Sequence, residues 1–261
     1  ERQFYVDYFF NDVLLRENVR EKLKDIYDIE RIAGKIIYGT ENGKDLLSLK
    51  DSIRKSLETY RLLKEHQELK KIFELDIEIL LDIYNKIELI IDAEAPFSVR
   101  EGGIIKDGYN SELDELRRIS KLGKDFILEI EQRERERTGI KGLKIKYNKV
   151  FGYFIEVTKA NEHLVPEDYI RKQTLVNSER YIVPDLKEYE EKVITAKSKI
   201  EALEYDLFKS LSSEIKEHIE SLYKLANRIA NLDIVSNFAH IATKNSYVKP
   251  EISEEDILEI K

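Results

Sequence analysis

LKIKYNKVFGYFIEV, residues 143–157, departs from the pattern of the chain around it. Apolar residues recur here at every second position, whereas on both sides they recur at every third or fourth position within long charged stretches. A period of two predicts strands, and NKVFG at 148–152 can turn the chain between two of them. Lysines stand at positions 141, 144, 146 and 149, with no acid among them. The sequence therefore predicts a basic β-hairpin in the middle of an otherwise helical and acidic chain.

A second pair of short apolar segments follows this hairpin. KQTLV (172–176) and RYIVP (180–184) flank Asn177-Ser178, a dipeptide suited to a turn. Together the two pairs predict a small, mostly antiparallel β-unit of about four strands, inserted as a separate domain over residues 139–184.

Two long amphipathic helices are expected on either side of this unit. The first runs from Ser111, a candidate N-cap with Asp114 three residues on, to about Thr138, and Gly139 suits the left-handed residue that ends a helix. The second follows Asp185, a candidate N-cap with Glu188 three residues on, and runs from 186 to about 220 with apolar spacings of three or four. Antiparallel packing of the two would place the β-unit at the far tip of an arm.

The remaining sequence predicts a helical bundle. Residues 4–93 have helical periodicity, broken only by GTENGK (39–44), with amphipathic helices over 12–37 and 45–65 and a buried central helix over 72–94. Residues 96–110 read as a loop and 223–245 as a last helix. The predicted fold is mainly α with a small antiparallel β insertion, and residues 1–138 and 185–261 form the helical core and the two long helices.

Composition excludes several classes of protein. The 261 residues contain no cysteine, which excludes disulfides and thiol chemistry, and no apolar run is long enough for a membrane span. The net charge of −8 argues against a general nucleic-acid binder, but residues 138–192 hold 10 Lys+Arg and 9 Asp+Glu and are the least acidic part.

Because the chain lacks an initiator methionine and stops within a pattern, we expect it to be a piece of a longer protein.

No constellation of residues indicates an enzyme. GTENGKD (39–45) has three residues between its glycines where a phosphate-binding loop needs four, and Asp45 would repel phosphate. The four histidines, at 66, 163, 218 and 240, lack the spacing of metal ligands. The sequence thus predicts no catalytic, cofactor-binding or metal-binding residue.

Charged helix ends leave a choice of interpretations. Glu129–Arg133 and Glu131–Arg135 are spaced for ion pairs within one helix, so an exposed, salt-bridged helix end is the plain interpretation of 129–139. A phosphate contact by Arg135 or Arg137 is the alternative.

The β-unit holds the best candidates for a binding site. Lys144 and Lys146 would share one strand face, Asn148 and Lys149 would lie at the first turn, and the second pair adds further polar residues: Arg171, Lys172, Gln173 and Asn177. Lysine and arginine neutralise phosphates, and amides donate to phosphate or sugar oxygens without reading sequence. The alternative is an edge strand that lysines protect against aggregation.

About 60 residues carry a specific resemblance to a known family. ERERTG (134–139), YNKVFGY (147–153), RKQTL (171–175) and ERY…PDLKEYE (179–190) follow one another as they do in the MutS family of bacterial DNA mismatch-repair proteins, and the flanks resemble it more loosely. The resemblance implies that the long helices are levers joining an ATPase domain to a clamp, and that the clamp touches duplex DNA weakly and without sequence preference. It also implies that Asn148 and Asn177 occupy positions that contact the DNA backbone.

The chain departs from the family in ways that matter. Phe154 stands where the family often has tyrosine and Val176 where some members have lysine, and both changes would remove a polar contact. FIE (154–156) mimics the mismatch-reading Phe-x-Glu motif but falls in a clamp strand, so we interpret it as coincidence.

Other expectations follow from the resemblance alone. This piece would be no enzyme and hold no cofactor, whereas the full-length parent would be a DNA-dependent ATPase that uses ATP and Mg²⁺. The parent would be a homodimer, act with downstream repair proteins and be cytoplasmic and DNA-associated in a bacterium, away from membranes. A family paralogue acting in recombination, and a coiled-coil module that binds an acidic protein, remain alternatives.

Overall fold

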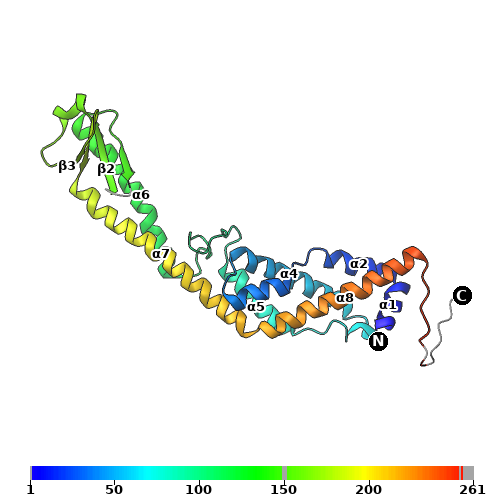
Figure 1. The fold of residues 1–261 in the computed structure, drawn as a ribbon. Helices are drawn as coiled ribbons and strands as arrows, with labels where there is room; N and C mark the ends of the chain where they lie inside the picture. Colours follow the sequence, from blue (N-terminus) through cyan, green and yellow to red (C-terminus); the bar gives the residue numbers. More distant parts are fainter. Residues whose placement is uncertain (1, 149–151, 253, 255–261) are drawn as a thin grey trace. The chain divides into compact units, whose positions relative to one another are not determined.

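The protein is described here from a computed structural model that covers residues 2–148, 152–252 and 254, without the side chains of 122–125, 188–189 and 191–193. Two compact units are present (Figure 1). The helical unit lies within residues 1–99, 103–106 and 208–261, and the sheet unit comprises 100–102 and 107–207. The chain is mainly helical with one small antiparallel sheet, as predicted.

Six helices and the end of a seventh build the described helical unit. They are α1 (Arg2–Asn11), α2 (Val13–Leu23), α3 (Ile29–Tyr38), α4 (Gly43–Leu63), α5 (Ile77–Ile90), α8 (Ile219–Asn245) and the last turns of α7 (Pro184–Glu217), with a short 3₁₀ turn, η1 (Gln67–Leu69). Helix α8 packs against α1, α2 and α3, and α4 packs against α2 and α5. Phe9, Ile32, Leu49 and Ile87 are fully buried in this unit.

The prediction of one helix over 12–37 is wrong. It divides into α2 and α3, because Asp28 caps α3 by accepting a hydrogen bond from the backbone N–H of Arg31 at 2.9 Å. Within a charged helical pattern, an aspartate that caps a helix cannot be distinguished from one on the helix surface, so the sequence did not indicate this boundary. The predicted break at 39–44 is confirmed: Gly39 takes the left-handed conformation (φ 69°), and Asn42 and Asp45 form a capping box for α4.

In the sheet unit, four short strands form an antiparallel sheet in the order β1-β2-β4-β3. The strands are β1 (Ile145–Asn148), β2 (Gly152–Thr158), β3 (Ile170–Thr174) and β4 (Ser178–Ile182), with a 3₁₀ segment η2 (Lys159–Leu164) after β2. Strand β2 pairs with β1 and β4, and β3 pairs with β4 through an irregularity between Arg171 and Gln173. The predicted four-stranded unit is thereby confirmed, with β1 and β3 at its two edges.

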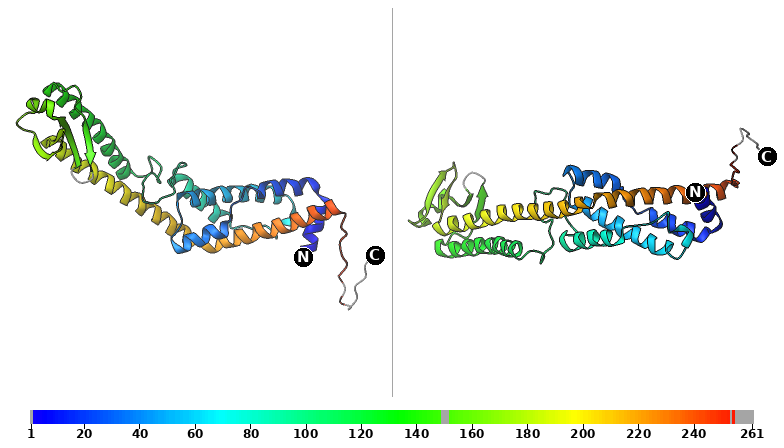
Figure 2. Two further views of the ribbon diagram at one scale, coloured as in Figure 1. Left: turned by 45° about the horizontal axis from the view of Figure 1, so that its top comes forward. Right: turned by 90° about the horizontal axis from the view of Figure 1, so that it is seen from below.

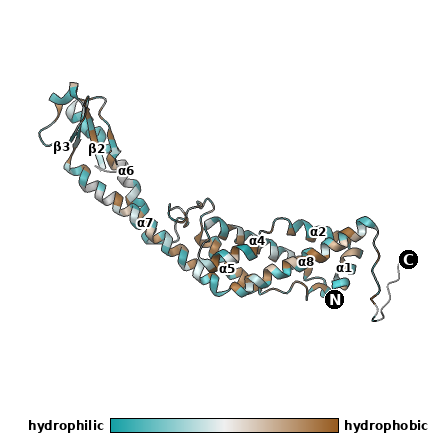
Figure 3. Cartoon of the chain, viewed as in Figure 1, coloured by the Kyte–Doolittle hydropathy of each residue, from teal (hydrophilic) through white to brown (hydrophobic). Residues whose placement is uncertain are grey.

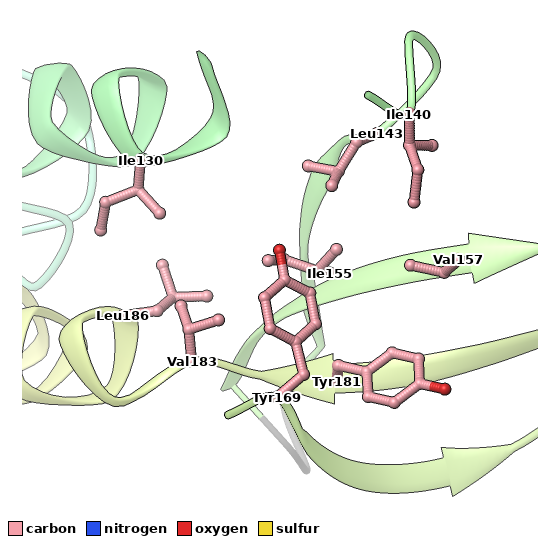
Figure 4. Packing of buried hydrophobic residues seen from close by; sticks show 9 residues of the cluster. All are labelled: Ile130, Ile140, Leu143, Ile155, Val157, Tyr169, Tyr181, Val183 and Leu186. Carbon is pink, nitrogen blue, oxygen red and sulfur yellow. The ribbon is translucent and has the colours of Figure 1, made fainter. Parts of the chain in front are cut away.

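A hydrophobic cluster joins one face of this sheet to the neighbouring helices (Figure 4). Ile155 and Tyr181 come from the strands, Ile130 from α6 (Ser111–Thr138) and Leu186 from α7, and Leu143 fills the space before β1. The four strands are too short to bury a core alone, so this face depends on the two helices for its stability.

Helices α6 and α7 run antiparallel beside each other within the sheet unit (Figures 1 and 2). Arg117 of α6 bonds to Glu204 of α7 at 2.7 Å, and Arg133 bonds to Asp185 at 2.9 Å. The partner numbers fall on α7 as they rise on α6, as antiparallel packing requires. Figure 3 shows hydrophilic and hydrophobic residues interspersed along both helices.

Both predicted N-caps are displaced by one residue or more. Asn110, rather than Ser111, caps α6 by accepting from the N–H of Leu113, and Asp114 accepts instead from the N–H of Gly108. Helix α7 begins at Pro184, so Asp185 lies inside its first turn. A proline fits the first helical position because its fixed φ suits the helix and no N–H is needed there. The predicted end of α6 is confirmed, with Gly139 at φ 69°.

None of the helices in the described part of the chain is long and apolar enough to cross a membrane.

Candidate nucleic-acid interface

The strands divide the sheet into two faces with different chemistry. Ile155, Val157 and Tyr181 point into the hydrophobic cluster and define the inner face. Glu156 and Arg180, which alternate with these residues, lie on the outer face. The position of each predicted binding residue along its strand therefore decides on which face of the sheet its side chain lies.

Lys144 is exposed just before β1, at a point where α6 fixes the backbone on both sides. Arg135 donates to the carbonyl oxygen of Leu143 from Nε at 3.1 Å and from Nη2 at 3.0 Å. Glu131 accepts from the N–H of Ile145 at 2.8 Å and pairs with Arg135 at 2.5 Å. This arrangement holds the Lys144 backbone in place while its ammonium group has no ion-pair partner in the described part of the chain.

A row of polar side chains crosses the outer face. Lys146 Nζ on β1 lies 2.9 Å from Glu156 Oε1 on β2, and Arg180 Nε on β4 lies 3.3 Å from Glu156 Oε2. Arg180 Nη1 donates to Gln173 Oε1 on β3 at 2.8 Å. The hydrogen bond from Lys146, assisted by Arg180 and opposed by partial burial, holds the pKa of Glu156 below its usual value. Lys146 and Gln173 thus meet through two residues that the sequence analysis did not select.

Phe154 lies beneath this row. Its side chain is buried, and the guanidinium of Arg180 lies 4.5 Å from the centre of its ring. A ring covered in this way is not available to stack on a base. The burial agrees with our interpretation that FIE only mimics the mismatch-reading motif.

Arg171 belongs to the inner side of the sheet. Its Nη1 lies 3.1 Å from Glu179 Oε1, and Glu179 also accepts from the Tyr181 hydroxyl at 2.5 Å. The bond from Tyr181, followed by that from Arg171, lowers the pKa of Glu179 against the effect of burial. Burial, together with Glu179, raises the pKa of Tyr181 to about 12. Arg171 therefore neutralises a buried carboxylate.

Lys172 occupies the irregularity between Arg171 and Gln173 and is exposed, with no ion pair to any described residue. It lies on the edge strand opposite to β1. Because neighbouring strands are about 4.8 Å apart, the two edges of a four-stranded sheet are roughly 14 Å apart. Lys144 and Lys172 therefore flank the outer row from opposite edges.

The two asparagines lie at opposite ends of the sheet. Asn148 pairs with Gly152 where β2 begins, whereas the turn that contains Asn177 meets the other end of β2, with its carbonyl accepting from the N–H of Lys159 at 3.1 Å. At about 3.3 Å per residue, the ends of β2 are roughly 20 Å apart. Lys149 lies outside the described residues. The predicted residues hence frame the outer face instead of forming one cluster.

Lys159 is a candidate that the sequence analysis missed. It is exposed beside the Asn177 turn and, within the described residues, makes no ion pair. Lys159 and Asn177 are eighteen positions apart in sequence, and the pairing of β2 with β4 brings them together. No sequence pattern indicated this contact.

The arginines at the end of α6 make structural contacts. Arg135 holds Leu143 and Glu131, and Arg137 Nη2 bonds to Asp168 Oδ1 at 2.6 Å. This supports the salt-bridged interpretation of the helix end over a phosphate contact. The expected Glu129–Arg133 pair does not form, because Arg133 turns instead to Glu134 and Asp185.

Among the described residues, no group of three or more His, Asp or Glu side chains is arranged to hold a metal ion.

Comparison with known proteins relates the chain to one family. The family model described as MutS family domain IV matches residues 108–199. The DNA mismatch repair protein MutS of Fusobacterium nucleatum is 90% identical over all 261 residues. The proteins of the same name from Clostridium beijerinckii and Bacillus cytotoxicus are 49% and 48% identical over 96% and 100% of the chain. The chain spans 29%, 27% and 29% of the length of these three relatives.

Proposed function

The chain belongs to the MutS family, and on that premise we propose that its four-stranded sheet binds the phosphate backbone of duplex DNA without reading sequence. The observation that carries the proposal is a pair of exposed lysines, Lys144 and Lys172, which lie at the two edges of the sheet and form no ion pair with any described residue. Ammonium groups bind phosphate by releasing condensed counterions, a contribution that does not depend on base sequence.

The chemistry of the outer face favours contact with the backbone over contact with bases. The acceptor groups of Gln173 and Glu156 are already occupied by Arg180 and Lys146. Base reading needs donors and acceptors that are free to match the groove edges. Phosphates can be bound at several points around the outer face of the sheet. Lys144 and Lys172 provide two of these points, and Lys159 and the two asparagines are further donors.

We extend the proposal to the longer protein of which this chain would form a part. There the sheet would act as a clamp, and because the relatives are named DNA mismatch repair proteins, we place that role in mismatch repair. Helix α7 contributes to both units, since residues up to 207 belong to the sheet unit and those from 208 belong to the helical unit. A continuous helix of this kind could couple an ATPase domain elsewhere in a homodimeric parent to the clamp.

The proposal is tested by fluorescence anisotropy of a labelled duplex titrated with the chain at several salt concentrations. Lys144→Glu/Lys172→Glu is the test variant. Lys70→Glu/Lys71→Glu, two exposed lysines of the helical unit, is the control with the same change in net charge. We expect weak binding, equal for matched and mismatched duplexes, with a log–log salt slope of roughly −2 to −4.

The test variant should lose most of this binding and reduce the salt slope by about 2, whereas the control should keep it. No binding by the unmodified chain at low salt would contradict the proposal. Equal losses in the two double variants would mean that net charge, and not the sheet, governs the interaction.

A further inference from the structure

Glu156 lies between two cations of the outer face and forms an ion pair with each of them. Each of its carboxylate oxygens takes one partner, Lys146 at Oε1 and Arg180 at Oε2. The three charges sum to +1, where the two cations alone would give +2. The carboxylate is about one-quarter exposed, so the bridge is open to an approaching ligand.

We propose that Glu156 competes with DNA phosphate for Lys146 and Arg180 and so sets the strength of backbone binding by the sheet. This inference rests on the function proposed above. A phosphate that approaches the outer face meets a carboxylate already bonded to the cations it would need. It must displace that carboxylate or bind only at the rim, through Lys144 and Lys172.

The side chain of Glu156 is not needed to hold the sheet together. Arg180 keeps two other contacts, the ring of Phe154 at 4.5 Å and the Gln173 amide oxygen at 2.8 Å. The backbone pairing of β2 with β1 and β4 does not depend on the side chain. Glu156 can therefore lose its charge with the arginine still in position.

The second bridging acid of the sheet makes a useful contrast. Glu179 is buried on the inner face, where it accepts from Arg171, Tyr181 and Thr174. Its removal would leave a buried hydroxyl and a cation without partners, which destabilises a fold. Of the two acids, only Glu156 is partly exposed and lies on the face that carries Lys146 and Gln173.

The chain offers a matched control in the helical unit. Glu58 also bridges one lysine and one arginine, with Lys22 at 3.3 Å and Arg54 at 2.9 Å, and it is about one-third exposed. Glu58→Gln changes the net charge by the same amount as Glu156→Gln and removes the same kind of bridge, but it does so in the other unit.

The experiment compares duplex binding by the unmodified chain, Glu156→Gln and Glu58→Gln over a range of salt concentrations. We expect Glu156→Gln to bind roughly 3- to 10-fold more tightly at low salt and to steepen the log–log slope by about 1, since one further cation becomes available to phosphate. Glu58→Gln should match the unmodified chain. Adding Lys146→Gln to Glu156→Gln should reverse most of the gain.

The outcomes separate this inference from the proposed function. If the unmodified chain binds DNA and Glu156→Gln binds no more tightly than Glu58→Gln, the competing role of Glu156 is wrong and the proposed function stands. If no variant binds DNA, both are wrong. Urea denaturation of the two single variants should give closely similar midpoints, and a selective loss of stability in Glu156→Gln would assign the bridge to the fold instead.

Discussion

At the scale of single residues, the partner of each charged side chain decides what that side chain can do. Lys146 and Arg171 each hold a carboxylate, whereas Lys144 and Lys172 hold none among the described residues. Four cations of similar sequence character thus differ in their availability to a ligand. Sequence could nominate all four, and only the register of the strands distinguishes them.

The cap of α6 provides a prediction at this scale. Asn110→Ala should destabilise the sheet unit by about 1 kcal/mol, because the N–H of Leu113 loses its acceptor at 2.9 Å. Ser111→Ala, the control, should change the free energy of unfolding by only a few tenths of that, because Asn110 already caps this helix. Urea denaturation followed by circular dichroism measures both. A larger loss for Ser111→Ala would contradict the observed cap.

At the scale of elements, α7 is the helix that the two units share. Leu186 packs in the cluster under the sheet, whereas Phe208, Leu211 and Ile215 are buried in the helical unit. Its 34 residues carry no glycine and no proline after Pro184. The coupling role proposed for α7 in the longer protein requires an uninterrupted helix of this kind.

Interrupting α7 tests that role. Leu203→Pro should destabilise the chain by about 3 kcal/mol or more, because proline removes a helix hydrogen bond and clashes with the preceding turn. Weaker DNA binding should accompany the loss. Leu203→Ala, which keeps the helix, is the control and should preserve DNA affinity. Unchanged thermal unfolding together with unchanged affinity in the proline variant would refute the proposed role of α7.

At the scale of the whole molecule, exposed ion pairs are distributed over both units. Hydrogen bonds from lysines lower the pKa of Asp76, through Lys224, and of Glu88, through Lys50 and Lys106, in the helical unit. Lys146 does the same for Glu156 in the sheet unit. With 52 acidic and 44 basic residues, the chain has a charge balance that shifts steeply as carboxylates take up protons.

These shifts predict loss of stability in acid. A carboxyl group whose pKa is lower in the folded than in the unfolded state contributes stability above its unfolded pKa, near 4, and loses it as pH falls through the folded value. The urea midpoint should therefore fall between about pH 5 and pH 3, with these three carboxyl groups together contributing roughly 1–2 kcal/mol. High salt, as a control, should reduce the pH-dependent part, since exposed pairs are screened. Equal midpoints at pH 6 and pH 3.5 would contradict this account.

Local sequence patterns were sufficient to predict the kinds of element and much of their order. Periodicity is local, so the alternation over 143–157 was sufficient to predict a hairpin, and the apolar spacing and Gly139 were sufficient to predict α6 and its end. The sequence did not locate the boundary between α2 and α3, the N-cap of α6 at Asn110 or the first residue of α7 at Pro184, because several neighbouring residues there suit the same position. Which of the described cations lack an ion-pair partner followed from the tertiary structure. The availability of each cation depends on the pairing of β2 with both β1 and β4, which places Glu156 between Lys146 and Arg180 and separates Asn148 from Asn177. Such pairing arises from contacts between residues that are far apart along the chain, so a local pattern does not reveal it.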